Sequence, residues 1–248
     1  MDRFFCLELL LGKKKLERLQ RSFVVVIGMG AVGGYATEAL ARSGVGRLRL
    51  VDFDVIKETN FNRHLLAIEP NLGKLKGEAA KERIVLINPQ CKVEALEIFA
   101  AQETMDGLLR GDPDLVLDAV DSLNPKAQIL EACFKKRIPV ISSMGAALRT
   151  DIFSIKSGDL FKTSGCPLAR ELRSKLRRRG IEKGLYCIYS DRPISKELAG
   201  DPVLNEEENY DRGRKRRKMG SLPTVTGAFG LALAHQAIRY LVGDLLLP

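Results

Sequence analysis

The fold of this chain is indicated by residues 23–33, which read FVVVIGMGAVG. The first part is apolar and mostly β-branched, which is typical of a strand buried on both faces of a parallel sheet. The rest places Gly28, Gly30 and Gly33 at the G-x-G-x-x-G spacing. Such glycines let the backbone turn tightly and bring free N–H groups at a helix start close to a phosphate. The stretch therefore predicts a strand, a turn and a helix that bind a nucleotide.

Strand and helix patterns continue to alternate after this unit. The segments run apolar and β-branched where we expect strands, and amphipathic where we expect helices. Strands are predicted at 48–51, 114–120 and 139–143, and helices at 31–43, 74–86 and 125–136. The alternation predicts a Rossmann-like, doubly wound α/β fold with a mainly parallel sheet and flanking helices.

The two ends of the chain extend this core. Residues 7–20 are amphipathic and predict a helix that leads into the first strand. Beyond residue 145 the alternation stops, and a smaller α+β extension is expected. It is predicted to hold strands at 152–161 and 185–190, a basic helix at 167–179, a long mobile loop at 191–221 and an apolar helix at 223–246. We expect a nucleotide-binding core at 1–150 and an extension at 151–248 within one domain.

Composition limits the class of protein. The 248 residues are 45% hydrophobic, and 40 Lys and Arg against 31 Asp and Glu give a net charge of +9, which favours phosphate-bearing partners and equally serves solubility. The five cysteines are dispersed and never form C-x-x-C, so neither a disulfide framework nor the common structural zinc signature is expected. No segment reaches the roughly 18 apolar residues of a membrane span. We expect a cytoplasmic protein with no membrane association.

Asp52 ends the second predicted strand, where a carboxylate can accept hydrogen bonds from a ribose. Up to this point the sequence fits an NAD-dependent oxidoreductase equally well. A structural alternative also exists, in which the glycine turn merely packs a helix on a strand.

Further polar residues favour a nucleotide that is split. Asp54, Asn60, Arg63, Lys76 and Asp121 follow in order. Cations beside a glycine turn suit an enzyme that cleaves ATP, because negative charge grows on the α-phosphate and on the departing pyrophosphate. The structural alternatives are that Asp54 caps a loop, that Asn60 forms a turn and that Lys76 is a solvated helix residue.

This ordered set resembles the ThiF, MoeB and HesA superfamily, which is similar to ubiquitin-activating enzymes, over about residues 2–241. The resemblance implies a role for each matching residue. Gly28, Gly30 and Gly33 would bind ATP, and Asp52 would bind its ribose. The ATP phosphates would be bound by Asn60, Arg63 and Lys76, with help from Asp54. Asp121 would lie beside Mg²⁺, and the catalytic residues would be Arg63, Lys76 and Asp121.

The chain departs from the superfamily pattern at its start. Relatives often carry an Arg-aromatic-x-Arg stretch whose second arginine reaches the neighbouring subunit's ATP, and Cys6 stands at that position here. Arg3 could substitute, or Arg63 and Lys76 could suffice.

More specific stretches are similar to the tRNA threonylcarbamoyladenosine dehydratase branch of the superfamily. They are residues 39–47, 118–126, 142–146, 166–170 and 220–227. The resemblance implies that ATP adenylates the carboxylate of the modification, after which the modification cyclises with loss of water. It also implies a tRNA substrate carrying threonylcarbamoyladenosine and a homodimer, and it raises a cysteine desulfurase system as a partner and a monovalent cation near the substrate loop.

Three other functions stay open. One is an adenylyltransferase that activates the C-terminus of a ubiquitin-like sulfur carrier, against which the missing C-x-x-C pairs count. The others are the NAD-dependent oxidoreductase and a non-catalytic tRNA-binding module.

The remaining candidates are basic segments and cysteines. Arg and Lys on the helix at 167–179 and in residues 212–218 would bind tRNA phosphates, or form a solvated surface. Cys166 and Cys187 could act as a nucleophile or sulfur acceptor, although a buried structural cysteine is the commoner case.

Overall fold

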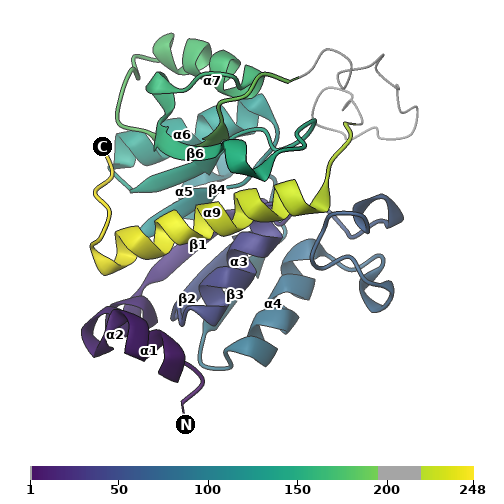
Figure 1. Cartoon of the computed structure of the whole chain (residues 1–248), viewed down its shortest axis with the longest axis vertical. Helices are drawn as coiled ribbons and strands as arrows, with labels where there is room; N and C mark the ends of the chain where they lie inside the picture. The colour runs from purple at the N-terminus through teal and green to yellow at the C-terminus, as the bar shows by residue number, and fades with distance from the viewer. Residues whose placement is uncertain (1, 195–218) are drawn as a thin grey trace.

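A seven-stranded sheet in the order β3-β2-β1-β4-β5-β7-β6 runs through the molecule, with helices on both faces (Figure 1). The computed structural model describes residues 2–194 and 219–248. The strands are β1 (Phe23–Ile27), β2 (Arg47–Val51), β3 (Lys92–Leu96), β4 (Leu115–Asp118), β5 (Val140–Ser143), β6 (Ile155–Asp159) and β7 (Tyr186–Ser190). All pairings are parallel except that of β6 with β7. The predicted Rossmann-like fold class is confirmed.

Two helical layers cover the sheet because its buried strands are apolar on both faces. On one side lie α3 (Gly33–Arg42), α4 (Lys76–Ile87) and α9 (Pro223–Val242), with α1 (Phe5–Leu11) and α2 (Lys13–Arg21) at the end of this layer; on the other lie α5 (Met105–Leu109), α6 (Leu123–Lys136) and α7 (Pro167–Arg177). Val24 and Val26 of β1 face the first layer, whereas Val25 and Ile27 face the second.

The register of the central strands positions the site. Ile27 pairs with both Val51 and Asp118, so β1, β2 and β4 end at the same level. The chain then leaves each strand at Gly28, Asp52 and Ala119. In an open α/β sheet, ligands bind outside these carboxyl ends, where the strand order reverses around β1.

Several local predictions are corrected. The helix expected at 7–20 is two helices, because Gly12 adopts φ +80° and interrupts the helical hydrogen bonding. Neither β3 nor α5 was predicted. The strand pattern of β3 is weak because Lys92 and Glu94 alternate with apolar residues at the sheet edge. The strand expected at 152–161 is shorter, with 3₁₀ turns on both sides of β6.

The C-terminal extension shares the sheet of the core, because β7 pairs directly with β5. The division at residue 150 remains a prediction. Most of the predicted loop at 191–221 lies outside the described residues. No helix within the described ranges combines the length and apolar character needed to cross a membrane.

Candidate functional site

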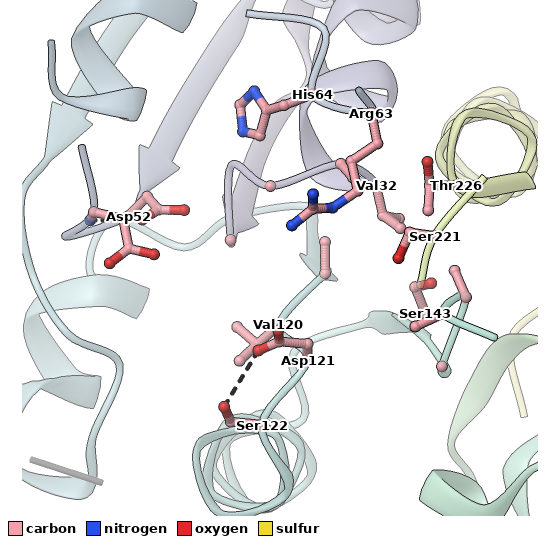
Figure 2. A pocket seen from close by; sticks show the side chains of 18 of the residues that line it. Val32, Asp52, Arg63, His64, Val120, Asp121, Ser122, Ser143, Ser221 and Thr226 are labelled. Atoms are coloured by element: carbon pink, nitrogen blue, oxygen red, sulfur yellow. Dashed lines mark hydrogen bonds between the residues drawn. The ribbon is translucent and has the colours of Figure 1, made fainter. Parts of the chain in front are cut away.

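A cavity of about 620 Å³ lies beyond the carboxyl ends of the central strands, which is a typical size for a small-molecule site. Most of the predicted residues line it: Gly28, Gly30, Asp52, Asp54, Asn60, Arg63, Lys76 and Asp121. Figure 2 shows Asp52 on one side of this cavity, Ser143, Ser221 and Thr226 on the other, and the Arg63 guanidinium between them. The fold therefore brings together residues that are far apart in the sequence.

The glycine turn leaves room for a ligand. Gly28 has φ +95°, and a Cβ there would stand 3.0 Å from the backbone of Ala119. A Cβ on Gly30 would meet no atom within 4 Å, because that position faces open space. Gly33, in contrast, is not among the lining residues; its Cβ would lie 1.7 Å from the Gly28 carbonyl oxygen. Gly33 thus allows α3 to pack against the turn, and its predicted contact with a nucleotide remains a prediction.

Asp52 fixes the glycine turn through its carboxylate. Its two oxygens accept hydrogen bonds from the backbone N–H groups of Met29, at 2.6 Å, and of Asp54, at 2.8 Å. Burial raises the pKa of Asp52, and the nearby Lys76 ammonium opposes that shift. The carboxylate keeps lone pairs for a ligand at the end of β2.

Two cations come from outside the strands. Lys76 begins α4 and is buried, with its Nζ 2.9 Å from Asp54 Oδ2. Its position excludes the alternative of a solvated helix residue. Arg63 donates from Nη1 to the carbonyl of Thr59 and to Asn62 Oδ1. Because this leaves other N–H groups of a guanidinium available, Arg63 can also bind an anion in the cavity.

Asn60 and Asp121 have structural partners as well. Asn60 Oδ1 accepts a hydrogen bond from the Lys57 backbone at 3.1 Å, so this residue forms a turn, as its structural alternative proposed, while it lines the cavity. Asp121 accepts one from Ser122 Oγ at 3.2 Å (Figure 2). Within residues 2–194 and 219–248, no cluster of three His, Cys, Asp or Glu side chains could hold a metal ion.

A buried ion pair lies beneath the cavity and was not predicted. Lys126 Nζ is 2.6 Å from Asp118 Oδ2, and both side chains are fully buried. The ammonium also donates to Ser142 Oγ and to the Ser143 carbonyl oxygen. These bonds join the carboxyl ends of β4 and β5. Sequence patterns do not indicate the pair, because only the packing of α6 against β4 and β5 brings Lys126 to Asp118.

His64 is a second residue that the sequence did not single out for the site. It lines the cavity and is 5% exposed, and its Nδ1 accepts a hydrogen bond from the Leu66 backbone. Burial, together with the Lys76 and Arg63 charges, lowers its pKa to about 4. The imidazole is therefore neutral at pH 7, and its protonated nitrogen is Nε2.

The far wall of the cavity comes from three separate segments. It includes Ser143–Ala147, which begins with the last residue of β5, Cys166–Leu168 at the start of α7, and Met219–Ser221 before α9. Each overlaps or adjoins one of the stretches 142–146, 166–170 and 220–227 that carried the resemblance. The structure thus places the specific sequence signatures opposite the glycine turn.

The model of the ThiF family matches residues 5–246 of this chain. The chain belongs to this family. A tRNA threonylcarbamoyladenosine dehydratase of Bacillus subtilis is 40% identical over 246 residues, covering 96% of this chain and 94% of the relative. The Escherichia coli enzyme of the same name is 32% identical, covering 93% and 90%.

The fold of this ThiF-family chain is also similar to a solved structure. A crystal structure of the E. coli tRNA N6-threonylcarbamoyladenosine dehydratase in complex with ATP superposes with a TM-score of 0.87. The two sequences are 30% identical, and the match covers 98% of this chain and 94% of that one.

The cysteines of this ThiF-family chain are placed differently from one another. Cys187 is fully buried in β7, and burial raises the pKa of its thiol strongly. A neutral buried thiol is a poor nucleophile, which favours the structural alternative. Cys166 is also buried but lines the cavity. Cys6 is exposed, and Arg3 donates from Nη1 to the Ile87 carbonyl oxygen of the same chain.

Part of the predicted basic surface is already engaged within the chain. Arg173 donates to Thr163, and Arg179 pairs with Glu131. Arg170, Arg177 and Arg178 are exposed on or beside α7. The basic residues 212–218 lie outside the described residues.

Proposed function

We propose that this chain is an ATP-dependent tRNA threonylcarbamoyladenosine dehydratase that activates a carboxylate by adenylation. The relatives that match nearly the whole chain bear that name. The observation that carries the proposal is the cavity, which faces the nucleotide residues with a wall made from the branch-specific stretches. An adenylyltransferase for a sulfur carrier would need the nucleotide residues of this site but not the wall that faces them.

The chemistry requires two displacements. A carboxylate oxygen of the modification attacks the α-phosphorus of ATP, and pyrophosphate leaves. A second group of the same modification then attacks the activated carbonyl carbon, and AMP leaves with the former carboxylate oxygen. The net result is loss of water from the modification and cleavage of ATP. Because both reacting groups belong to one modification, ring closure has the advantage of an intramolecular reaction, and no enzyme nucleophile is needed.

Each residue of the site has its own role in these displacements. Asp52 orients the ribose, the glycine turn receives phosphates through its N–H groups, and Arg63 and Lys76 stabilise the charge that grows on phosphate oxygens. One cation about 4 Å from such a charge is worth roughly 4 kcal/mol at an effective dielectric of 20.

Asp121 is proposed as the protein ligand of Mg²⁺. Its carboxylate lines the cavity and is exposed to it, which fits a cation that takes one or two carboxylates and completes its shell with nucleotide phosphates and water. When bound, Mg²⁺ would neutralise phosphate charge.

The partners belong to the same proposal. A tRNA would approach along the exposed arginines of α7, and the enzyme would act as a cytoplasmic homodimer. A cysteine desulfurase system is the remaining candidate partner, and it rests on family resemblance.

Nucleoside mass spectrometry tests the function. Purified protein, ATP and Mg²⁺ are incubated with tRNA from cells that lack this enzyme, and a reaction without ATP serves as control. We expect threonylcarbamoyladenosine to lose one water only when ATP is present. An unchanged nucleoside, together with ATP–pyrophosphate exchange that depends on the C-terminus of a carrier protein, would establish the adenylyltransferase instead.

A further inference from the structure

Arg149 lies in the connection that follows β5, and its side chain is buried, with 6% of the residue exposed. Its guanidinium binds four neutral oxygens. Nε donates to the Gly145 carbonyl at 2.8 Å, and Nη1 donates to Ser190 Oγ at 2.7 Å and to the Arg192 carbonyl at 2.8 Å. Nη2 donates to the Gly165 carbonyl at 3.4 Å.

These acceptors lie on three segments that are remote in sequence, and each segment contributes to the lining of the cavity. Gly145 itself lines the cavity, Gly165 immediately precedes the lining residue Cys166, and Arg192 lies two residues before the lining residue Ile194. One side chain therefore connects the loop after β5, the entry to α7 and the chain that leaves β7.

The backbone beside Arg149 is held in an unfavourable conformation. Leu148 has φ +60°, a region that costs a branched non-glycine residue about 1–3 kcal/mol. Its N–H donates to the Gly220 carbonyl at 2.9 Å, which attaches the same loop to the segment before α9. Such a conformation persists only where the surroundings impose it, and here they include a fourth cavity-lining segment.

The guanidinium of Arg149 is better suited to holding several loops together than to stabilising the fold alone. Burial of a cation among neutral oxygens is costly, so an apolar contact would stabilise the same loops more simply. A guanidinium offers five N–H donors in a rigid plane and can serve several carbonyls at once, whereas a lysine ammonium is a compact point charge.

We propose that Arg149 is a positioning residue for the acceptor side of the site, and that it fixes the wall against which the modified nucleoside is placed. This inference rests on the proposed function, because the nucleotide residues occupy the opposite side of the cavity. Arg149 acts through the carbonyl and hydroxyl groups that it holds, and it is not itself among the residues that line the cavity.

Arg149→Lys and Arg149→Gln test the role, with Arg49→Lys as a matched control. Arg49 is a buried arginine at 1% exposure that also donates to two backbone carbonyls, those of Leu108 and Arg110, and pairs with Glu94; none of these partners lines the cavity. The thermal midpoint, the ATP dissociation constant and kcat/KM for the modified tRNA are measured for each full-length variant.

We expect both Arg149 variants to lose at least tenfold in kcat/KM for tRNA while ATP affinity stays within about twofold. Arg49→Lys should lower the thermal midpoint without changing kcat/KM for tRNA. If the Arg149 variants keep wild-type kcat/KM, or lose ATP affinity as much as tRNA turnover, the positioning role is wrong.

Leu148→Gly supplies a variant that keeps the arginine and removes a strained φ. We expect it to fold with unchanged or higher stability and to lose kcat/KM for tRNA, since glycine releases the loop. Unchanged turnover would count against the proposal even if the Arg149 variants do not fold. If the wild-type protein binds ATP but does not dehydrate the tRNA, the proposed function is wrong. If the variants dehydrate the tRNA as well as the wild type does, only the role of Arg149 is wrong.

Discussion

Lys76 and Asp54 form an ion pair inside the cavity, with 2.9 Å between Nζ and Oδ2. The sequence predicted both as separate contacts of a nucleotide, but the structure shows that they also hold each other. A backbone hydrogen bond from Lys76 to the Asp54 carbonyl, at 3.0 Å, reinforces the pairing. Asp54 therefore holds the lysine at the start of α4, where its charge acts on Asp52 and His64.

Lys76→Ala should lower the rate of tRNA dehydration by about 10²–10³, the usual loss when one group that stabilises transition-state charge is removed. Lys74→Ala is the matched control, because Lys74 forms an exposed ion pair with Glu82 at 3.0 Å. The rate is measured at saturating ATP. Equal rates for the two variants would remove Lys76 from the catalytic groups.

Gly33→Ala should destabilise the protein by about 2 kcal/mol or more, because its Cβ would overlap the Gly28 carbonyl oxygen. Gly34→Ala is the control in the same helical turn, where the nearest atom to a Cβ is 3.8 Å away. That variant should be neutral or stabilising by up to about 1 kcal/mol through helix propensity. Denaturant unfolding measures both, and comparable losses would show that the close approach is not the cause.

His64 should make stability fall in acid. Its pKa drops from 6.5 to about 4 on folding, so between these values the unfolded chain binds a proton that the folded chain does not. The free energy of unfolding should therefore decrease by about 3 kcal/mol from this group as pH falls from 6.5 to 4. We expect His64→Gln to reduce the pH slope and His235→Gln, an exposed control, to keep it. The measurement is the slope of the free energy of unfolding against pH. An unaltered slope in His64→Gln would show that His64 does not cause the loss of stability in acid.

Cys187→Ser should keep dehydration within about twofold and lower the thermal midpoint. A serine hydroxyl buried without a hydrogen-bond partner costs about 1–3 kcal/mol, while a buried neutral thiol contributes no nucleophile. Cys6→Ser, at an exposed site, should change neither property. Complete loss of dehydration with normal ATP binding would instead identify Cys187 as a chemical participant.

Replacement of Arg177 and Arg178 by alanine should weaken tRNA binding. The slope of log affinity against log salt should decrease by about 1–2, since each arginine that contacts a phosphate releases counterions. Lys13 and Lys14 are the control pair, exposed on α2, which lies far from α7 (Figure 1). Titrations at several salt concentrations give the slopes. If the α2 pair has the larger effect, tRNA does not bind along α7.

The cavity-lining residues at the strand ends could be predicted because their signals are local. A β-branched run, glycines at fixed spacing and polar residues at strand ends carry their own structural meaning, and parallel strands necessarily bring their carboxyl ends to one edge. Gly28 and Asp52 were thus identified from their neighbouring residues, whereas Arg63 and Lys76 were assigned through the superfamily resemblance. β3 was missed since an edge strand with alternating charges lacks that signal.

The far wall of the cavity was decided by tertiary structure. Arg149 stands in a loop without any distinctive pattern, and its partners Gly145, Gly165 and Arg192 are joined only after β5, α7 and β7 pack. Likewise, Lys126 and Asp118 become a buried pair because the sheet encloses them. A strand or a glycine turn follows from neighbouring residues, whereas a buried charge finds its acceptors among groups that only the folded chain brings within hydrogen-bond distance.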